Sequence, residues 1–340
     1  MNALGTAFVT GSTGLLGNNL VRALLSRGVR VRALARSRAK AEQQFEGLAG
    51  LEIVEGDMLA VSRFAATLAG VDVLFHTAAH FRDSYTGGDH WEALRATNID
   101  GARSLLSAAY DAGVRRAVMT SSIAVLDGRR GAVIDETMVR PVAKADDYYR
   151  SKILADEVAF EAMKLHHDFN ISFVLPGWMH GPGDAGPTSA GQVTLDFLNR
   201  KLPGVAPGTF SVVDARDVAL AMVAAAERGR RGERYLAAGR HMTMAELLKV
   251  YEQVTGIPAP KGKLPPLLLL LIATVSEAMA RMTGKPTLLS LATVRLMLRE
   301  AERTRFDPAK SERELGLTFR PIAETLRDEI AWFRARGRLV

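Results

Sequence analysis

The stretch that decides the fold is "LGTAFVTGSTGLLGNNLVRALLSRG", residues 4–28. A short apolar run over residues 4–9 leads into a turn that contains Gly11, Gly14 and Gly17. Apolar residues at helical spacing then continue to Gly28, and glycine commonly ends a helix. The pattern predicts a buried strand, a tight glycine turn and a helix, which together make the first unit of a parallel sheet.

The same alternation continues along the chain and predicts the fold class. Further strands are expected near residues 29–36, 51–57, 71–80, 115–122, 171–177, 210–214 and 234–239, and later helices near 243–256, 265–283, 287–303 and 322–337. We expect an α/β protein with a Rossmann-type, doubly wound parallel sheet and a smaller, mainly helical C-terminal domain. Residues 1–176 are expected to form the sheet domain, to which 209–228 and the final helix return, and 177–208 with 229–320 the smaller domain.

Composition narrows the class of protein. The 340 residues include no cysteine, so disulfides and thiolate metal sites are excluded. No apolar run reaches the length of a membrane span, and the N-terminus lacks a signal-peptide pattern, so we expect a cytoplasmic protein. The net charge is +7, but the arginines are dispersed beside acidic residues, which predicts no nucleic-acid partner. The seven histidines are scattered without metal-ligand spacing, so no metal is expected.

The glycine turn matches what a dinucleotide pyrophosphate requires. Bare backbone N–H groups and a helix N-terminus attract the phosphates, whereas side chains would block their approach. An NAD site usually places a carboxylate after the second strand. Here Arg36 takes that place, with Ser37, Arg38 and Lys40 nearby. A guanidinium there would pair with a 2′-phosphate, which predicts NADP; ordinary solvated surface charge is the alternative.

A tyrosine–lysine pair lies in "DDYYRSKILADE", residues 146–157. Tyr148 and Lys152 are four residues apart and share a helix face, whereas Tyr149 is turned about 100° away. We expect the ammonium group to lower the pKa of Tyr148 from about 10 and the lysine to hold the cofactor ribose. Ser122 ends the fifth strand, where its hydroxyl could bind a substrate oxygen. The set predicts reduction of a carbonyl group, with the phenol as proton donor; a surface helix pair is the alternative.

Several motifs together resemble the extended short-chain dehydrogenase/reductase family. They are the TGxxGxxG turn, Gly56-Asp57, "HTAA" (76–79), "TNIDG" (97–101), "TSS" (120–122) and "YYRSK" (148–152). The resemblance covers nearly the whole chain. It implies a seven-stranded Rossmann sheet with a small C-terminal substrate domain, and a catalytic set at Ser122, Tyr148 and Lys152.

The resemblance also implies further site residues. Asp57 corresponds to the family's adenine-contacting aspartate, Asn98 to the asparagine behind the active site, and "LPGWMHGPGD" (175–184) to the segment beside the nicotinamide. His80 and His180 follow the fourth and sixth strands, so we expect them, with Trp178, to contact the substrate; a structural or solvated role is the alternative for each histidine. The cofactor contacts expected are Gly11, Ser12, Thr13, Gly14, Leu15, Gly17, Arg36, Asp57, Met58, Ala78, Ala79, Tyr148, Lys152, Pro176, Gly177 and Met179.

Within the family, the chain is most similar to dihydroflavonol-reductase-like and 3β-hydroxysteroid-dehydrogenase-like members. "VRALAR" (31–36) and the C-terminal half carry this likeness. Ile123 and Ala124 follow Ser122, where sugar-nucleotide dehydratases have an Asp-Glu pair. We therefore expect NADP-dependent reduction of a ketone or aldehyde of a lipophilic small molecule. Nucleotide-sugar epimerisation is the alternative, and a non-catalytic NAD(P) sensor is the alternative of another class.

The segment "PPLLLLLIATVSEAMARMT", residues 265–283, leaves three interpretations open. It is a buried helix of the smaller domain, or an apolar wall over the nicotinamide together with residues 287–298, in which Met279 and Met282 adapt to a lipophilic ligand. The third interpretation is a surface that rests on a membrane or on a second subunit of a homodimer.

Overall fold

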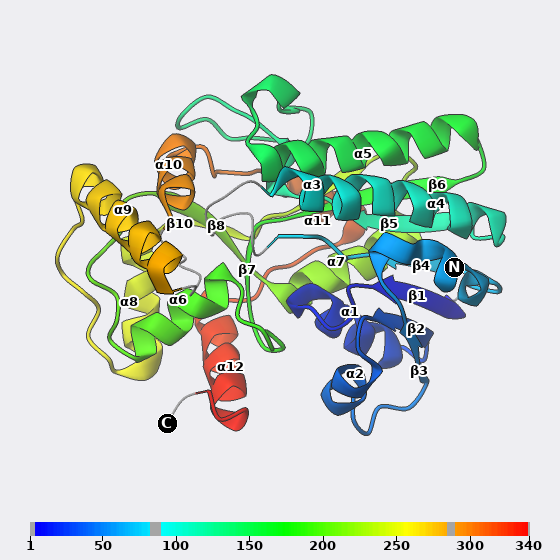
Figure 1. Cartoon of the computed structure of the whole chain (residues 1–340), viewed down its shortest axis with the longest axis horizontal. Coiled ribbons are helices and arrows are strands. Elements are labelled where there is room, and N and C mark those ends of the chain that lie inside the picture. The colour runs from blue at the N-terminus through cyan, green and yellow to red at the C-terminus, as the bar shows by residue number, and fades with distance from the viewer. Residues whose placement is uncertain (1–3, 82–89, 284–289, 339–340) are drawn as a thin grey trace.

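Seven parallel strands form the central sheet of the computed structural model, which describes residues 4–81, 90–283 and 290–338 (Figure 1). The strand order is β3-β2-β1-β4-β5-β6-β9, so the direction of winding reverses between β1 and β4. Ligands of such sheets bind at this switch point, beyond the carboxyl ends of the strands. The strands are β1 (Thr6–Thr10), β2 (Arg30–Ala35), β3 (Leu51–Glu55), β4 (Val73–His76), β5 (Arg116–Thr120), β6 (Asn170–Pro176) and β9 (Arg234–Ala237).

Helices cover both faces of this sheet, which confirms the predicted doubly wound architecture (Figure 1). Strand alternation divides the core: Ala7 and Val9 of β1 face one cluster, and Phe8 faces the other. The first cluster packs under α1 (Leu15–Leu25), α2 (Arg38–Gln44), α7 (Ala215–Arg228) and α11 (Ala309–Leu315). The second packs under α3 (Trp91–Leu94), the π-helical turn η4 (Arg95–Asp100), α4 (Gly101–Asp111) and α5 (Asp147–Leu165). Short 3₁₀ helices are η1 (Met58–Arg63), η2 (Ala65–Leu68), η5 (Ile123–Val125) and η6 (Val142–Lys144).

A smaller sheet with its own core adjoins the central one. It runs β10-β8-β7, with β7 parallel and β10 antiparallel to β8. Apolar side chains such as Phe197, Leu247 and Leu326 join it to three helices. The elements are β7 (Trp178–His180), β8 (Thr209–Asp214), β10 (Arg240–Thr243), α6 (Ser189–Leu198), α8 (Met244–Thr255) and α12 (Ile322–Ala335). Beyond them α9 (Pro266–Thr283) packs against α10 (Leu291–Glu300) at the outer edge of the molecule (Figure 1).

The observed division of the chain differs from the expected one at several elements. Residues 229–320 were expected in the smaller domain, but β9 lies in the central sheet, where Phe173 pairs with Arg234. The final helix was expected to return to the central sheet, but α12 buries Ile322 and Ile330 in the core of the smaller sheet instead. Segment 209–228 is divided, because β8 belongs to the smaller sheet and α7 packs against α1.

Candidate active site

The glycine turn between β1 and α1 leaves room only for backbone. Gly11 has a φ of 63°, and a side chain there would lie 2.7 Å from the Ala78 nitrogen at the end of β4. A side chain at Gly17 would collide with the Gly11 carbonyl group. Gly14 is exposed at the start of α1, and no side chain caps that helix. The positive end of the helix is therefore bordered by bare backbone, an arrangement that fits a pyrophosphate.

The other residues expected in the turn are Ser12, Thr13 and Leu15. The Ser12 hydroxyl is buried and donates to the Leu34 carbonyl at 2.8 Å, and the Thr13 carbonyl accepts from the Gln44 side chain at 3.2 Å. Leu15 is buried under the turn. Ser12 therefore fixes the turn to β2 rather than offering its side chain to a ligand.

The cationic side chains after β2 differ in whether they already have a hydrogen-bonding or ionic partner. Arg36 is exposed and has no hydrogen-bonding or ionic partner among the described residues. Arg38, in contrast, donates to the Ile53 carbonyl at 2.7 Å and lies 3.8 Å from Glu42. Ser37 caps α2 by accepting from the Lys40 amide. Among the described residues, Arg36 and Lys40, unlike Arg38, can pair with a phosphate without breaking an existing side-chain contact.

Two further loops border the same edge of the sheet. After β3, Asp57 accepts from the Leu59 amide at 2.9 Å, and Met58 is buried beside it. After β4, the Ala78 amide donates to the Thr10 hydroxyl at 3.2 Å and Ala79 is exposed. The segments that were expected to contact a cofactor thus follow β1, β2, β3 and β4 at their carboxyl ends, around the switch point.

The end of β6 is closely packed. Pro176 is buried, and a side chain at Gly177 would lie 2.5 Å from the carbonyl oxygens of both Ser211 and Ala238. Met179, two residues on, packs against the core on the α1 side of the sheet. Glycine is therefore required at 177 because the main sheet and the smaller sheet meet there.

Ser122, Tyr148 and Lys152 meet at the end of β5. The Ser122 hydroxyl accepts from the Ala124 amide at 3.1 Å, and it lies near enough to the Tyr148 phenol to act on the pKa of that group. Lys152 lies on the same face of α5 as Tyr148, and its ammonium donates to the Thr120 carbonyl at 2.6 Å. An ammonium has three protons, so two remain for other partners.

The pKa of Tyr148 contradicts the expectation from the sequence. Burial raises this pKa above the ordinary value, the charge of Asp146 raises it further, and the hydrogen bond from Ser122 opposes the rise. The predicted lowering by Lys152 is therefore wrong, because the ammonium is directed at the Thr120 carbonyl and desolvation dominates. Burial also lowers the pKa of Lys152 to about 8, against the charge of Asp156.

A buried carboxylate supports the lysine, and sequence reasoning missed it. Asp156 is one turn after Lys152 on α5 and is 3% exposed. Its Oδ2 accepts from the Ser121 hydroxyl at 2.9 Å and lies 3.4 Å from Nε of Arg234 on β9. The i, i+4 spacing from Lys152 was the available signal. The contribution of Arg234 was hidden, because nothing local places β9 beside β6.

Asn98 joins the loop after β4 to the catalytic helix. Its side-chain oxygen accepts from the His80 amide at 2.7 Å, and its amide group donates to the His80 carbonyl at 3.2 Å and to the Ser151 hydroxyl at 3.0 Å. Asn98 lies in the π-helical turn η4, a distortion frequent at functional sites. The backbone of His80 is thereby fixed beside α5.

The other two expected substrate residues lie farther into the smaller domain. Trp178 is half-buried and donates its indole N–H to Ser189 at 3.0 Å. His180 is fully buried, and its Nδ1 lies 3.0 Å from Glu329 of α12. The expectation that His180 contacts substrate is therefore wrong in this structure, because the side chain is enclosed between β7 and α12.

Tyr149 occupies a different environment from Tyr148. The Arg140 guanidinium lies 4.9 Å from the centre of its ring, and Arg140 forms a buried, two-pronged ion pair with Glu300, at 2.9 Å and 3.3 Å. Arg299 of α10 reaches Asp146, the residue that caps α5. These contacts attach the end of α10 to the start of the catalytic helix.

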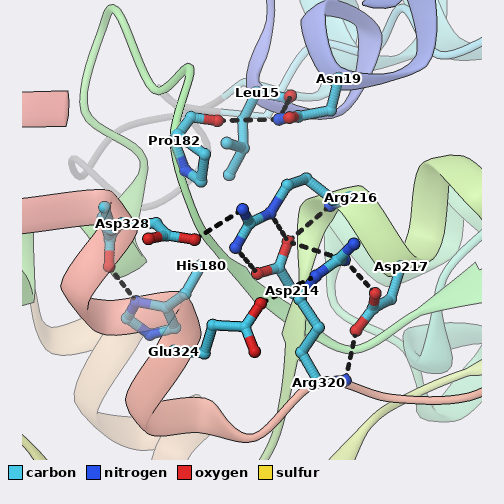
Figure 2. Close-up of polar contacts among 11 residues, drawn as sticks. Leu15, Asn19, His180, Pro182, Asp214, Arg216, Asp217, Arg320, Glu324 and Asp328 are labelled. Carbon is cyan, nitrogen blue, oxygen red and sulfur yellow. Dashed lines mark hydrogen bonds and ion pairs between the residues drawn. The ribbon is translucent and has the colours of Figure 1, made fainter. Parts of the chain in front are cut away.

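A network of ion pairs attaches α12 to α7 (Figure 2). Arg216 pairs with Asp214 and with Asp328 of α12, each at 2.7 Å, and Arg320 pairs with Asp217. Figure 2 also shows Asn19 of α1 donating to the carbonyl groups of Leu15 and Pro182. The loop after β7 is therefore joined to the helix that starts at the glycine turn.

Comparison with known proteins agrees with this geometry. The family model described as the NAD dependent epimerase/dehydratase family matches residues 7–238. The chain belongs to this family. Sterol demethylase protein B of Methylococcus capsulatus is 37% identical over 98% of this chain and 100% of that protein. A Stigmatella aurantiaca protein named 4-hydroxy-2-methyl-3-oxo-4-farnesyl-3,4-dihydroquinoline-1-oxide ketoreductase is 32% identical over 76% of this chain and 75% of its own.

Two further likenesses confirm the subgroup and the fold. A 3 beta-hydroxysteroid dehydrogenase/Delta 5→4-isomerase of Mycobacterium tuberculosis is 36% identical over 45% of this chain and 41% of its own. The crystal structure of gox2253 superposes with a TM-score of 0.83 at 30% identity, over 98% of this chain and 99% of that one. The chain is an enzyme of the extended short-chain dehydrogenase/reductase type, with reductases and dehydrogenases among its relatives.

The described part of the chain has neither a cluster of metal-binding side chains nor a membrane-spanning helix. No group of three or more histidine or acidic side chains over 4–81, 90–283 and 290–338 could hold a metal ion. No helix in those ranges is long and apolar enough to cross a membrane.

Proposed function

We propose that this enzyme uses NADPH to reduce a ketone or aldehyde of a lipophilic small molecule to an alcohol. The observation that carries the proposal is the placement of Ser122 beside the Tyr148 phenol at the end of β5, with Lys152 on the same face of α5 and bonded to the Thr120 carbonyl. When bound, the reduced nicotinamide supplies a hydride to the carbonyl carbon. Tyr148 supplies the proton to the carbonyl oxygen, which completes the alcohol.

Tyr148 is protonated at neutral pH, because its pKa is raised, and so it holds the proton to be given. The same shift makes the free phenol a weaker acid, so the proton transfer depends on the negative charge that develops on the substrate oxygen. The Ser122 hydroxyl orients the carbonyl oxygen toward that phenol. Lys152, with a pKa of about 8, is mainly charged at neutral pH. Its two remaining N–H donors can hold the ribose.

We assign the cofactor site to the switch point of the sheet. Gly11, Gly14 and Gly17 admit the pyrophosphate, and Arg36 pairs with the 2′-phosphate that distinguishes NADP from NAD. We retain the remaining expected contacts for the nucleotide and nicotinamide: Ser12, Thr13 and Leu15 through their backbone, Asp57, Met58, Ala78, Ala79, Pro176, Gly177 and Met179.

A lipophilic substrate is supported by the relatives and by the chemistry of the site. Two similar proteins carry names that refer to a sterol and to a farnesylated ketone. Ile123 and Ala124 after Ser122 offer no carboxylate for elimination from a sugar. We place the substrate between the end of β5 and the smaller sheet with α6, α8, α9 and α10, and the reaction in the cytoplasm.

A series of ketones and aldehydes of growing chain or ring size tests the proposal. Loss of NADPH absorbance gives kcat/KM for each compound. Burial of each added methylene is expected to contribute about 0.8 kcal/mol, or about fourfold in kcat/KM. A flat response across the series, together with tight binding of a UDP- or dTDP-sugar, would instead favour an epimerase.

A further inference from the structure

Helix α9 buries one face and exposes the other. Leu269 and Ala273 are 1% and 0% exposed where they pack against α10. Leu267, Leu271 and Val275, at four-residue spacing, are 82%, 60% and 51% exposed. The interpretation of 265–283 as a fully buried helix is therefore wrong for this face; the side chain of Met282 lies outside the described residues. We call Leu267, Leu268, Leu271 and Val275 the leucine stripe.

Helix α9, which carries the leucine stripe, lies at the outer edge of the molecule, on the far side of the smaller sheet from β1–β3 (Figure 1). Single exposed apolar side chains are ordinary, but a contiguous row on one helix face indicates an interaction surface. At 18 residues α9 is about 27 Å long and does not meet the requirements of a membrane span. Such a helix can lie in the plane of a membrane surface instead.

Exposed cations gather at the N-terminal end of α9. A backbone bridge between Val205 and Lys263 holds the loop after α6 beside the segment that leads into α9. Leu264 donates to the Val205 carbonyl at 3.0 Å within the same bridge. The two segments carry four exposed cations that have no ionic partner among the described residues: Arg200, Lys201, Lys261 and Lys263.

The charge pattern favours an anionic membrane over a second copy of this chain as the occupant of this surface. An anionic phospholipid bilayer offers acyl chains to the leucine stripe and phosphates to the four cations. A second copy of this chain would bring the same cations, and the one carboxylate in the sequence of α9, Glu277, accepts from the Leu291 amide. We propose that α9 docks in the plane of an anionic membrane surface, with the leucine stripe in the lipid and the cations on the headgroups.

Flotation of the full chain with lipid vesicles tests this docking, and it requires neither substrate nor cofactor. Phosphatidylcholine vesicles with about 30 mol% phosphatidylglycerol should carry the protein upward at low salt, and neutral vesicles much less. Leu267→Ser/Leu271→Ser should weaken binding by about tenfold or more. The matched control is Leu165→Ser, because Leu165 is 76% exposed at the end of α5, away from this surface. Lys261→Glu/Lys263→Glu should reduce both the binding and its sensitivity to salt.

The proposal is overturned if the wild-type chain fails to float with anionic vesicles at low salt, or if the leucine double variant binds as well as Leu165→Ser does. Sedimentation velocity provides the competing outcome. A dimer that is lost in the leucine variant, without vesicle binding, would make the stripe a contact between copies. Thermal unfolding checks that each variant is folded, and reduction of a water-soluble ketone reports separately on the proposed activity.

Discussion

Replacing Asp156 with asparagine should move the pH dependence of turnover. Asp156 is buried, and its charge opposes the lowering of the Lys152 pKa, which is about 8. Without that charge, desolvation acts on Lys152 with less opposition, so its pKa falls further. The charged form of Lys152 is present below its pKa and lost above it. The high-pH limb of kcat/KM should therefore move to lower pH by about one unit, which corresponds to about 1.4 kcal/mol.

The pKa values of the neighbouring groups leave Lys152 as the group whose titration produces the high-pH limb. His76 is buried and has a pKa lowered to about 3, so it stays neutral at and above neutral pH. The pKa of Tyr148 is raised, so its titration lies above that of Lys152. Burial raises the pKa of Asp156 itself, and Arg234 opposes that rise.

The assay is NADPH oxidation with one ketone from about pH 6 to 9, run on wild type, Asp156→Asn and Asp156→Glu. The glutamate variant keeps the charge and should keep the wild-type limb. The asparagine variant also leaves Arg234 without its carboxylate, which should lower the free energy of unfolding by up to about 3 kcal/mol. An active Asp156→Asn enzyme with an unchanged high-pH limb would refute the reasoning, whatever its stability.

Two further predictions concern binding and stability. Arg36→Ala should weaken NADPH binding by about 1.5–3 kcal/mol and leave NADH nearly unaffected, measured as dissociation constants by fluorescence titration; equal weakening of both would contradict the role of Arg36. Glu300→Ala removes the two-pronged partner of the buried Arg140 and leaves it only the longer contact with Asp127 at 3.9 Å, so urea unfolding should show a loss of up to about 3 kcal/mol. Arg299→Ala is the control, since its side chain is 43% exposed, and should cost less than about 1 kcal/mol; a similar loss in both variants would count against the importance of the Arg140 pair.

The sheet was predictable because its signals are local. Each strand of the first half is a short apolar run, and the glycine turn that starts α1 is visible in eight letters of sequence. The places of β9 and α12 were not predictable in the same way. Four residues of β9 pair with β6. The sequence of α12 is amphipathic, but this pattern does not indicate whether the helix packs against the central sheet or the smaller one. Long-range packing decides both.

In the candidate site, too, the local features were predictable from the sequence and the features that depend on long-range packing were not. Helix geometry places Tyr148 and Lys152 on one face and separates them from Tyr149, which the structure surrounds with Arg140 and Arg299 instead. The direction of the Tyr148 pKa shift was not predictable, because desolvation depends on packing that a spacing cannot reveal. Arg234 reaches Asp156 across 78 residues of chain, so its role required the topology.

The most direct test of the proposed chemistry compares Tyr148→Phe with Tyr149→Phe under single-turnover conditions with NADPH and a ketone substrate. Removing the proton donor should lower the rate of reduction by about 100-fold or more while NADPH still binds. Tyr149→Phe keeps the ring that stacks under Arg140 and removes only its hydroxyl, so it should change the rate by less than about tenfold. Retention of most activity in Tyr148→Phe, with loss in Tyr149→Phe, would contradict the assignment of Tyr148 as the proton donor.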